Sequence, residues 1–301
     1  MPPKTVARRT AAGPVARERV VFLPAERKPA ILGVIRGARQ RLALSMFRCD
    51  DFDVLDALAA ALGRGVRVDV LLTGRARGWR TRLDHLWQVL ESMGATLHRF
   101  GDPVVKYHAK YLIADDGPAV VASLNFTRDC FTETADFIVV THDRPVVQSL
   151  IRLFDADCRD AGLAVSRRLS PRLIVGPQRA REMFASLLRG ARRRIALVDH
   201  KLTDPAMLEL LRARERAGVR LTVLGRSHRS GFRPHGKLLI VDDRVAVVGS
   251  LALSALSLDF RREVAIVVRD RACVARLVEV FERLERAPAG RAGRQSKEVL
   301  R

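Results

Sequence analysis

The residues of this chain that are best suited to chemistry stand in two short motifs with identical spacing. Each motif is His-x-Lys-x4-Asp, and the two copies comprise His108, Lys110, Asp115 and His235, Lys237, Asp242. The chain has only seven lysines against 47 arginines, yet one lysine stands at the same place in both copies. By chance, a chain of this composition holds roughly 0.01 copies of the motif, and a second copy is about a hundredfold rarer. Two such His-Lys pairs can surround one phosphate.

The spacing within each motif suits a strand, because side chains two residues apart on a strand point to the same face. Histidine ionises near neutral pH and therefore serves as a nucleophile or a proton carrier, while an ammonium group binds anionic oxygens. Asp115 and Asp242 complete the motifs and are counted among the candidate catalytic residues. Their place at the far end of each strand is, however, typical of structural turn residues.

Each motif opens a predicted β-hairpin, in which an apolar run follows the lysine, then a turn and a second apolar strand. If the first hairpin folds about residues 116–117, His108 lies opposite Asn125 and Lys110 lies opposite Ser123. Ser250 takes the corresponding place in the second hairpin. We therefore predict that Asn125 joins the catalytic residues and that both serines bind substrate.

The two motifs belong to a longer internal repeat. Residues 41–47 match 194–200 and residues 65–71 match 218–224, each with an offset of 153, whereas the motifs are 127 residues apart. The first half therefore carries about 26 additional residues between these points. They include the segment 81–93, whose apolar residues have helical spacing.

Strands alternate with helices in both halves, which predicts α/β layers. The predicted strands and hairpins are 20–23, 41–47, 66–72, 96–100, 107–125 and 136–140, then 172–175, 194–199, 219–224, 235–252 and 264–268. The predicted helices are 27–38, 52–63, 81–93 and 145–159, then 178–189, 204–216 and 271–285. The predicted domains are a basic disordered arm at 1–19, repeats at 20–163 and 164–286, and a basic disordered tail at 287–301.

The two motifs with their following serines resemble the signature of the phospholipase D superfamily, H-x-K-x4-D-x6-G-S-x-N. The repeat that carries them covers most of the chain. Ala122 replaces the glycine in the first copy, and Ala252 replaces the asparagine in the second, which removes one phosphate-facing amide. The resemblance implies two similar α/β sandwich halves, each with a mixed central sheet flanked by helices, related by pseudo-twofold symmetry.

The resemblance also implies a mechanism that needs no metal and no other cofactor. His108 would attack phosphorus and form a phosphohistidine, while His235 would protonate the leaving alcohol and then activate water or an acceptor alcohol. Lys110, Lys237 and Asn125 would hold the non-bridging oxygens and stabilise the developing charge.

Members of this superfamily also tend to carry a glutamate, shortly after the motif, that supports a catalytic histidine. Glu263 fits this position in the second half. In the first half, Glu133 is the nearest candidate, although its position fits less well.

The net charge of +21 points to polyanionic partners, either nucleic acid or anionic lipid. Two arginine-rich loops, 74–82 and 225–233, leave the predicted sheets just upstream of the motifs, and each contains one aromatic residue. We expect both loops at the mouth of a shared cleft, because they are equivalent in the repeat. Their predicted substrate contacts are Arg75, Arg77, Arg229 and Arg233.

The sequence also bears on the location of the protein. It contains no apolar stretch of 18 residues or more, so no transmembrane helix is predicted, and its basic start lacks the apolar core of a secretory signal. Its four cysteines form no C-x-x-C pair, which favours a reducing compartment. We expect a cytoplasmic monomer that associates peripherally with the inner membrane surface.

Three functions are consistent with these features. The first is a phospholipase D-type phosphodiesterase or phosphatidyltransferase acting on phospholipids, as in phospholipase D or cardiolipin synthase. The second is a metal-independent nuclease that cleaves DNA or RNA. The third is an inactive homologue that binds phosphate.

Overall fold

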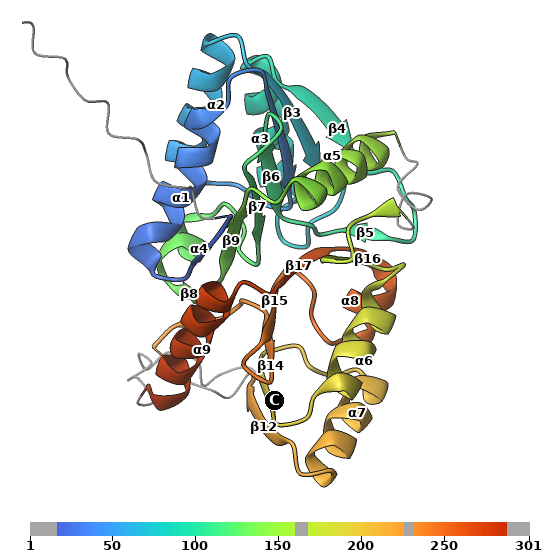
Figure 1. Ribbon diagram of the computed structural model, residues 1–301. Coiled ribbons are helices and arrows are strands. Elements are labelled where there is room, and N and C mark those ends of the chain that lie inside the picture. Colours follow the sequence, from blue (N-terminus) through green and yellow to red (C-terminus); the bar gives the residue numbers. More distant parts are fainter. Residues whose placement is uncertain (1–16, 160–167, 226–230, 288–301) are drawn as a thin grey trace, which may run out of the picture.

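The computed structural model describes residues 17–159, 168–225 and 231–287, and its two halves lie one above the other in Figure 1. The Arg229 contact predicted for the second loop lies outside the described residues. The elements of the first half are β1 (Glu18–Val21), α1 (Pro24–Gly37), β2 (Arg41–Met46), α2 (Phe52–Gly63), β3 (Arg67–Leu72), α3 (Arg80–Ser92), β4 (Thr96–Arg99), β5 (Lys106–Tyr107), β6 (Tyr111–Ala114), β7 (Ala119–Ala122), α4 (Arg128–Thr132), β8 (Thr134–Ala135), β9 (Ile138–Thr141) and α5 (Arg144–Cys158).

The second half repeats this order, and its described residues contain no equivalents of α3 and β4. Its elements are β10 (Leu173–Val175), α6 (Ala180–Gly190), β11 (Arg194–Val198), α7 (Pro205–Arg216), β12 (Arg220–Leu224), β13 (Arg233–Pro234), β14 (Leu238–Val241), β15 (Val245–Gly249), α8 (Ala255–Phe260), β16 (Arg261–Arg262), β17 (Val264–Val268) and α9 (Arg271–Arg286).

Each half is built on a mixed sheet, and the two sheets share one topology. The first has the strand order β1-β9-β7-β6-β2-β3-β4, and the second has the order β10-β17-β15-β14-β11-β12. Within the described parts of the chain, the first sheet alone has an additional edge strand, β4, which follows the additional helix α3. The prediction of two similar α/β halves is confirmed.

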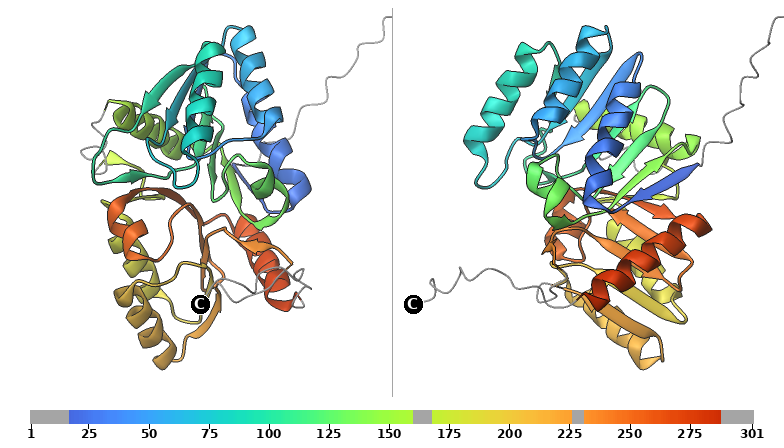
Figure 2. Two further views of the ribbon diagram at one scale, coloured as in Figure 1. Left: turned by 180° about the vertical axis from the view of Figure 1, so that it is seen from behind. Right: turned by 90° about the vertical axis from the view of Figure 1, so that its left-hand side faces the viewer.

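Helices cover the outer face of each sheet, and the inner faces share a common core (Figures 1 and 2). On the outer side, α1, α2 and α3 pack on the first sheet, while α6 and α7 pack on the second. The common core joins residues of both sheets with α5 and α9. Because both faces of the central strands are buried, their sequences are continuous apolar runs with no polar alternation.

The helix starts follow from local chemistry. Asp51 caps α2 by accepting a hydrogen bond from the backbone N–H of Val54, and Asp204 caps α7 by accepting one from Met207, with a proline at the start of the helix. None of the described helices is long and apolar enough to cross a membrane.

The register of the first hairpin differs by one residue from the prediction. Tyr111 pairs with Val121, so Lys110 lies opposite Ala122, not opposite Ser123. The strands are joined by three residues between Ala114 and Pro118, and the Ala114 N–H donates to the Pro118 carbonyl. A turn of two residues was expected, and the additional residue shifts every pair along the hairpin by one.

Candidate functional site

Each His-x-Lys motif is held by a strand of the opposite half. His108 follows β5, which pairs in parallel with β16, and its backbone N–H donates to the carbonyl of Arg262 at 2.9 Å. His235 follows β13, which pairs in parallel with β8, and the N–H of Gly236 donates to the carbonyl of Ala135 at 2.7 Å. These two short strand pairings between the halves bring both motifs to the junction.

Each histidine is also bonded to a carboxylate of the opposite half. Nδ1 of His108 bonds to the carboxylate of Glu263, and Nδ1 of His235 lies 2.9 Å from Oδ2 of Asp136. A neutral imidazole that donates from Nδ1 keeps the Nε2 lone pair free. The contact joins Glu263 to the histidine of the opposite half, and its supporting role in catalysis stays a prediction.

The corresponding prediction for the first half is corrected, because Asp136 occupies the place proposed for Glu133. Glu133 is exposed and binds the guanidinium of Arg233 at 2.9 Å. Asp136 and Glu263 are 127 residues apart, as the two motifs are, so the repeat offset was the signal that identifies it. The sequence prediction named a glutamate, whereas the residue that bonds to His235 is an aspartate.

Hydroxyl groups behind the site hold both carboxylates in place. Ser123 and Thr134 donate to Asp136, and Ser257 donates to Glu263. Ser123 and Ser250 were expected to bind substrate, but both are buried and use their hydroxyls internally. Ser123 also accepts from the N–H of Phe137 at 2.9 Å, and the hydroxyl of Ser250 accepts from the N–H of Val264 at 3.2 Å.

The two motif lysines are buried beside the histidines. Nζ of Lys110 donates to the carbonyl of His108 at 2.8 Å, and Nζ of Lys237 donates to that of His235 at 2.5 Å. Burial lowers the pKa of Lys110 well below its ordinary value. Each ammonium therefore retains donors for an anion in a site with little access to water.

The electrostatic effects on the two histidines come from both halves. Burial lowers the pKa of His108 well below its ordinary value, and the ammonium groups of Lys110 and Lys237 lower it further. Burial also lowers the pKa of His235, where the carboxylate of Asp136 opposes the shift. The lysine of the opposite half thus contributes to lowering the pKa of each histidine.

The two carboxylates differ in ionisation. Burial opposes the ionised form of Asp136, but the contact with His235 outweighs it and lowers the pKa of Asp136. Burial raises the pKa of Glu263. His235 therefore faces a strongly ionised partner, whereas His108 faces a carboxyl group that ionises less readily.

Ring contacts at the two histidines follow the repeat as well. The ring centroid of Phe47 lies 4.4 Å from that of His108, and the ring of His200 lies 6.4 Å from that of His235. Phe47 and His200 are equivalent positions, 153 residues apart. Sequence reasoning did not assign either to the site, because neither belongs to a motif.

Asn125 lines a pocket of about 570 Å³ on the His235 side of the site. Its side chain is buried, its amide nitrogen lies 4.0 Å from Sγ of Cys130, and its Oδ1 has no hydrogen-bond partner among the described residues. At Ala252 in the second half, no side-chain amide exists, and its backbone N–H donates to Ser257 at 2.8 Å. The two halves therefore offer different polar groups to a bound ligand.

The motif aspartates lie away from the histidines, at the hairpin turns. Asp115 accepts hydrogen bonds from the backbone N–H groups of residues 39–41, and Asp242 accepts from those of residues 192–194. These bonds lower the pKa of both carboxyl groups, although partial burial opposes the shift. The arrangement favours the turn role over direct catalysis.

The predicted arginine contacts are partly engaged within the protein. Arg75 donates to the carbonyl of Pro103 at 2.9 Å, and Arg233 lies 2.7 Å from a carboxylate oxygen of Asp129. The side chain of Arg77 is exposed. Of these residues, Arg233 lines the pocket beside His235.

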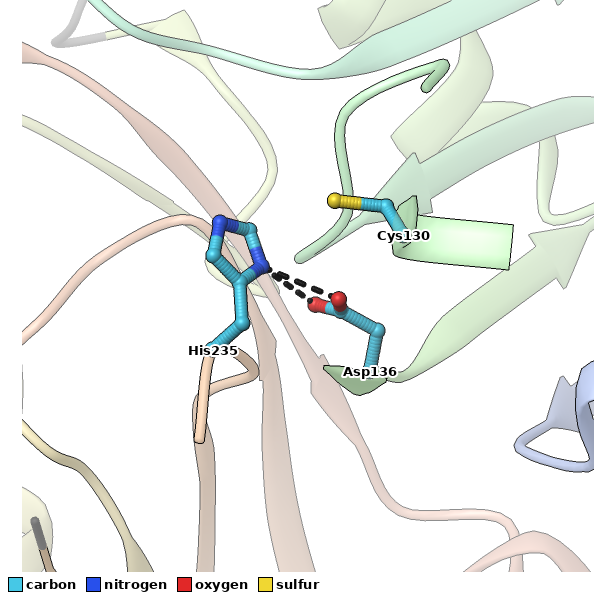
Figure 3. A group of neighbouring side chains, drawn as sticks. All are labelled: Cys130, Asp136 and His235. Atoms are coloured by element: carbon cyan, nitrogen blue, oxygen red, sulfur yellow. Dashed lines mark hydrogen bonds and ion pairs between the residues drawn. The ribbon is translucent and has the colours of Figure 1, made fainter. Parts of the chain in front are cut away.

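One group of side chains in the described part of the chain has the composition of a metal site. The potential ligand atoms of Cys130, Asp136 and His235 all lie within 4.8 Å of one another, and Figure 3 shows them converging. A metal ion here would have to replace the hydrogen bonds between His235 and Asp136. Sequence spacing did not reveal this group, because its members come from both halves.

The fold is that of the phospholipase D superfamily. Within it, the chain belongs to the family described as "Cardiolipin synthase, PLD-like domain", whose model matches residues 31–158 and 172–285. No curated protein matches the sequence significantly.

Solved structures with the same fold have low sequence identity. Polyphosphate kinase from Porphyromonas gingivalis matches 88% of this chain with a TM-score of 0.72 and 18% identity. This chain covers 46% of that kinase, less than half of its length. Phosphatidylserine synthase from Haemophilus influenzae Rd KW20 matches over 90% of this chain and 86% of its own, with a TM-score of 0.71 and 11% identity.

Proposed function

We propose that this protein is a metal-independent phosphodiesterase or phosphatidyltransferase that acts on phospholipids through a phosphohistidine. The observation that supports the proposal is that each half supplies the carboxylate that binds the motif histidine of the other half. Each motif histidine is oriented by a carboxylate of the opposite half, so that two His-Lys pairs meet at one junction. A single phosphodiester between them would contact both halves at once.

The different surroundings of the two histidines support different roles. A nucleophile must be neutral, and burial favours neutral His108, whose pKa is lowered more strongly. A general acid must carry a proton, and the ionised carboxylate of Asp136 favours the protonated form of His235. We therefore assign His108 as the nucleophile and His235 as the acid.

In the first step, Nε2 of His108 attacks phosphorus, and the leaving alcohol takes a proton from His235. In the second step, His235 takes a proton from water or an acceptor alcohol, whose oxygen attacks phosphorus and releases His108. Lys110 and Lys237 stabilise the charge on the non-bridging oxygens in both steps, because an ammonium group in a buried site acts with little competition from water.

A phospholipid substrate is proposed because the matching family model describes a cardiolipin synthase-like domain. The net charge of +21 would favour binding to an anionic lipid surface. The balance between hydrolysis and transfer depends on whether water or an alcohol attacks the phosphohistidine.

The test compares product formation on three substrates: phosphatidylglycerol vesicles, single-stranded DNA and duplex DNA, each with EDTA present. We expect release or exchange of the lipid head group and no change with chelator. Binding alone cannot serve as the readout, since a strongly basic protein binds all three. Activity that disappears with EDTA would contradict the metal-independent mechanism.

Cleavage of DNA in this comparison would favour the alternative, a metal-independent nuclease. The net charge and the arginines around the pocket are the observations that support it. If no substrate turns over while phosphate still binds, the protein is the inactive homologue.

A further inference from the structure

The pocket beside His235 holds two cations that flank one aromatic ring. The guanidinium carbon of Arg48 lies 5.1 Å from the ring centroid of Trp79, and that of Arg82 lies 5.3 Å from the same centroid. All three residues line the pocket of about 570 Å³ together with Asn125 and His235. The pocket is therefore continuous with the proposed catalytic site.

The ring of Trp79 holds this pair of cations in a fixed place. Trp79 precedes α3 and packs on the buried cluster of Phe47, Ala76 and Leu83. Phe47 also contacts the ring of His108. Because the tryptophan face is already engaged by arginines, its role is to position cations more than to stack on a base.

The positive charge in this pocket is poorly compensated. Arg48 has no carboxylate partner among the described residues; one amino group donates to the carbonyl of Arg77 at 2.9 Å, and its buried Nε has no partner there. Arg82 is 3.9 Å from Asp50, at the limit of an ion pair.

The charge of Arg82 also affects the ionisation of Arg48. Burial lowers the pKa of Arg48, and the charge of Arg82 lowers it further. Arg48 is partly buried and Arg82 is exposed, and two like charges held this close gain from an anion that binds between them.

Arg233, in the same pocket, provides the contrast. Its guanidinium lies 2.7 Å from a carboxylate oxygen of Asp129 and 2.9 Å from one of Glu133. The pocket therefore contains one arginine with two close carboxylate partners, one whose carboxylate contact is long, and one with no carboxylate partner among the described residues.

We propose that Arg48, Trp79 and Arg82 form a second anion site, which binds a further phosphate of the substrate beside the scissile phosphodiester. The inference rests on the proposed function and adds a substrate class to it: phosphodiesters that carry a second phosphate on the His235 side.

The repeat places different described residues on the two sides of the site. Lys201 is the equivalent of Arg48, and burial together with the charge of Lys237 lowers its pKa to about 8. Among the described residues, the second half has no helix at the place of α3, the helix that follows Trp79 and carries Arg82. The insertion in the first half thus makes the two sides of the pseudo-symmetric site different.

The experiment measures kcat/KM on two matched substrate pairs at one ionic strength. The first pair is the para-nitrophenyl ester of thymidine monophosphate with and without a phosphate on the free sugar hydroxyl. The second pair is phosphatidylglycerol and phosphatidylglycerol phosphate in detergent micelles of equal lipid content. The wild type should prefer the doubly phosphorylated member by about tenfold in at least one pair. The pair that shows the preference identifies the source of the phosphate.

The Arg48→Gln and Arg82→Gln variants should each reduce this preference by about fivefold. A structural defect would slow both members of a pair equally and leave their ratio unchanged. Arg216→Gln is the matched control, because Arg216 is exposed, bound to Glu209 at 2.6 Å and remote from the pocket. It should keep the wild-type ratio.

The inference is overturned if the wild type shows no preference in either pair, or if both variants keep the wild-type ratio. If no substrate is cleaved, the proposed function fails separately from the anion site. Calorimetric binding of the two thymidine esters then provides the same comparison, with the same expected preference and the same overturning result.

Discussion

At the residue scale, the two motif histidines are distinguished by the carboxylates that hold them. His235 bonds to Asp136, whose pKa is lowered, while His108 bonds to Glu263, whose pKa is raised by burial. The motifs share their His, Lys and Asp residues, so the proposed difference in role is attributed to the partner supplied by the opposite half. This asymmetry makes a prediction about pH.

The Asp136→Asn variant should narrow the active range of pH from its alkaline side. The carboxylate of Asp136 raises the pKa of His235 against the effect of burial. Without it, His235 loses its proton at a lower pH, so the descending limb of the kcat/KM profile should move to lower pH. The maximal rate should fall by about 100-fold or more, as general acid catalysis is impaired.

Glu133→Gln is the control for this variant, because Glu133 is an exposed carboxylate close in sequence that binds Arg233 and not a histidine. Its pH profile should match the wild type. An Asp136→Asn profile with an unmoved descending limb would contradict the assignment of His235 as the acid.

At the scale of elements, the two motif aspartates have a structural role at the hairpin turns. Asp115 has a φ of 50° and Asp242 a φ of 54°, and each accepts backbone hydrogen bonds from the segment that leads into the neighbouring strand. They fix β6 to β2 and β14 to β11, and so hold the strands on which the lysines depend.

Replacing Asp115 with alanine should therefore reduce stability more than catalysis. We expect the free energy of unfolding to fall by about 2 kcal/mol, with kcat of the folded protein close to the wild type. Because the pKa of Asp115 is depressed in the folded state, its contribution is present at neutral pH and lost as the pH falls below the ordinary carboxyl range.

Urea unfolding at several pH values measures this effect. Asp116→Ala, at the exposed neighbouring position, is the matched control and should change stability by less than about 0.5 kcal/mol. A large loss of kcat with unchanged stability in Asp115→Ala would instead indicate a catalytic role.

The elements show how far the sequence alone could lead. The long helices and apolar strands were predictable from periodicity and caps, and the motif pairs identified the chemistry. The two-residue strands β5, β8, β13 and β16 were not predictable, because a strand of two residues has no detectable hydrophobic periodicity. The sequence therefore did not predict the pairing between the halves that brings Asp136 to His235, although the 127-residue offset pointed to Asp136 itself.

At the scale of the whole molecule, the halves are joined by a buried ion pair as well as by the shared core. Arg262 in β16 of the second half lies 3.2 Å from Asp157 in α5 of the first, and both side chains are fully buried. Arg262 also donates to the carbonyl of Gly176 at 3.1 Å and to Gln178 at 2.8 Å. Its backbone carbonyl holds His108, so this pair links the junction to the catalytic site.

Arg262→Met should therefore destabilise the protein by about 3–5 kcal/mol, because it removes the guanidinium that faces the buried Asp157 charge. Urea unfolding provides the measurement. The double variant Arg262→Met/Asp157→Leu should recover part of the loss, since apolar side chains replace both charges. A single variant that unfolds as the wild type does would mean that the ion pair contributes little to the junction.

The central claim is that one site, shared by both halves, transfers a phosphoryl group through His108. The most direct measurement is intact-protein mass spectrometry, with peptide mapping, after an alkaline quench of the reaction with a para-nitrophenyl phosphodiester. This leaving group needs little protonation, so His235→Ala should form the phosphohistidine on His108 but fail to hydrolyse it, and the adduct should accumulate. His108→Ala should form no adduct. An adduct on another residue, or one that persists in His108→Ala, would contradict the account.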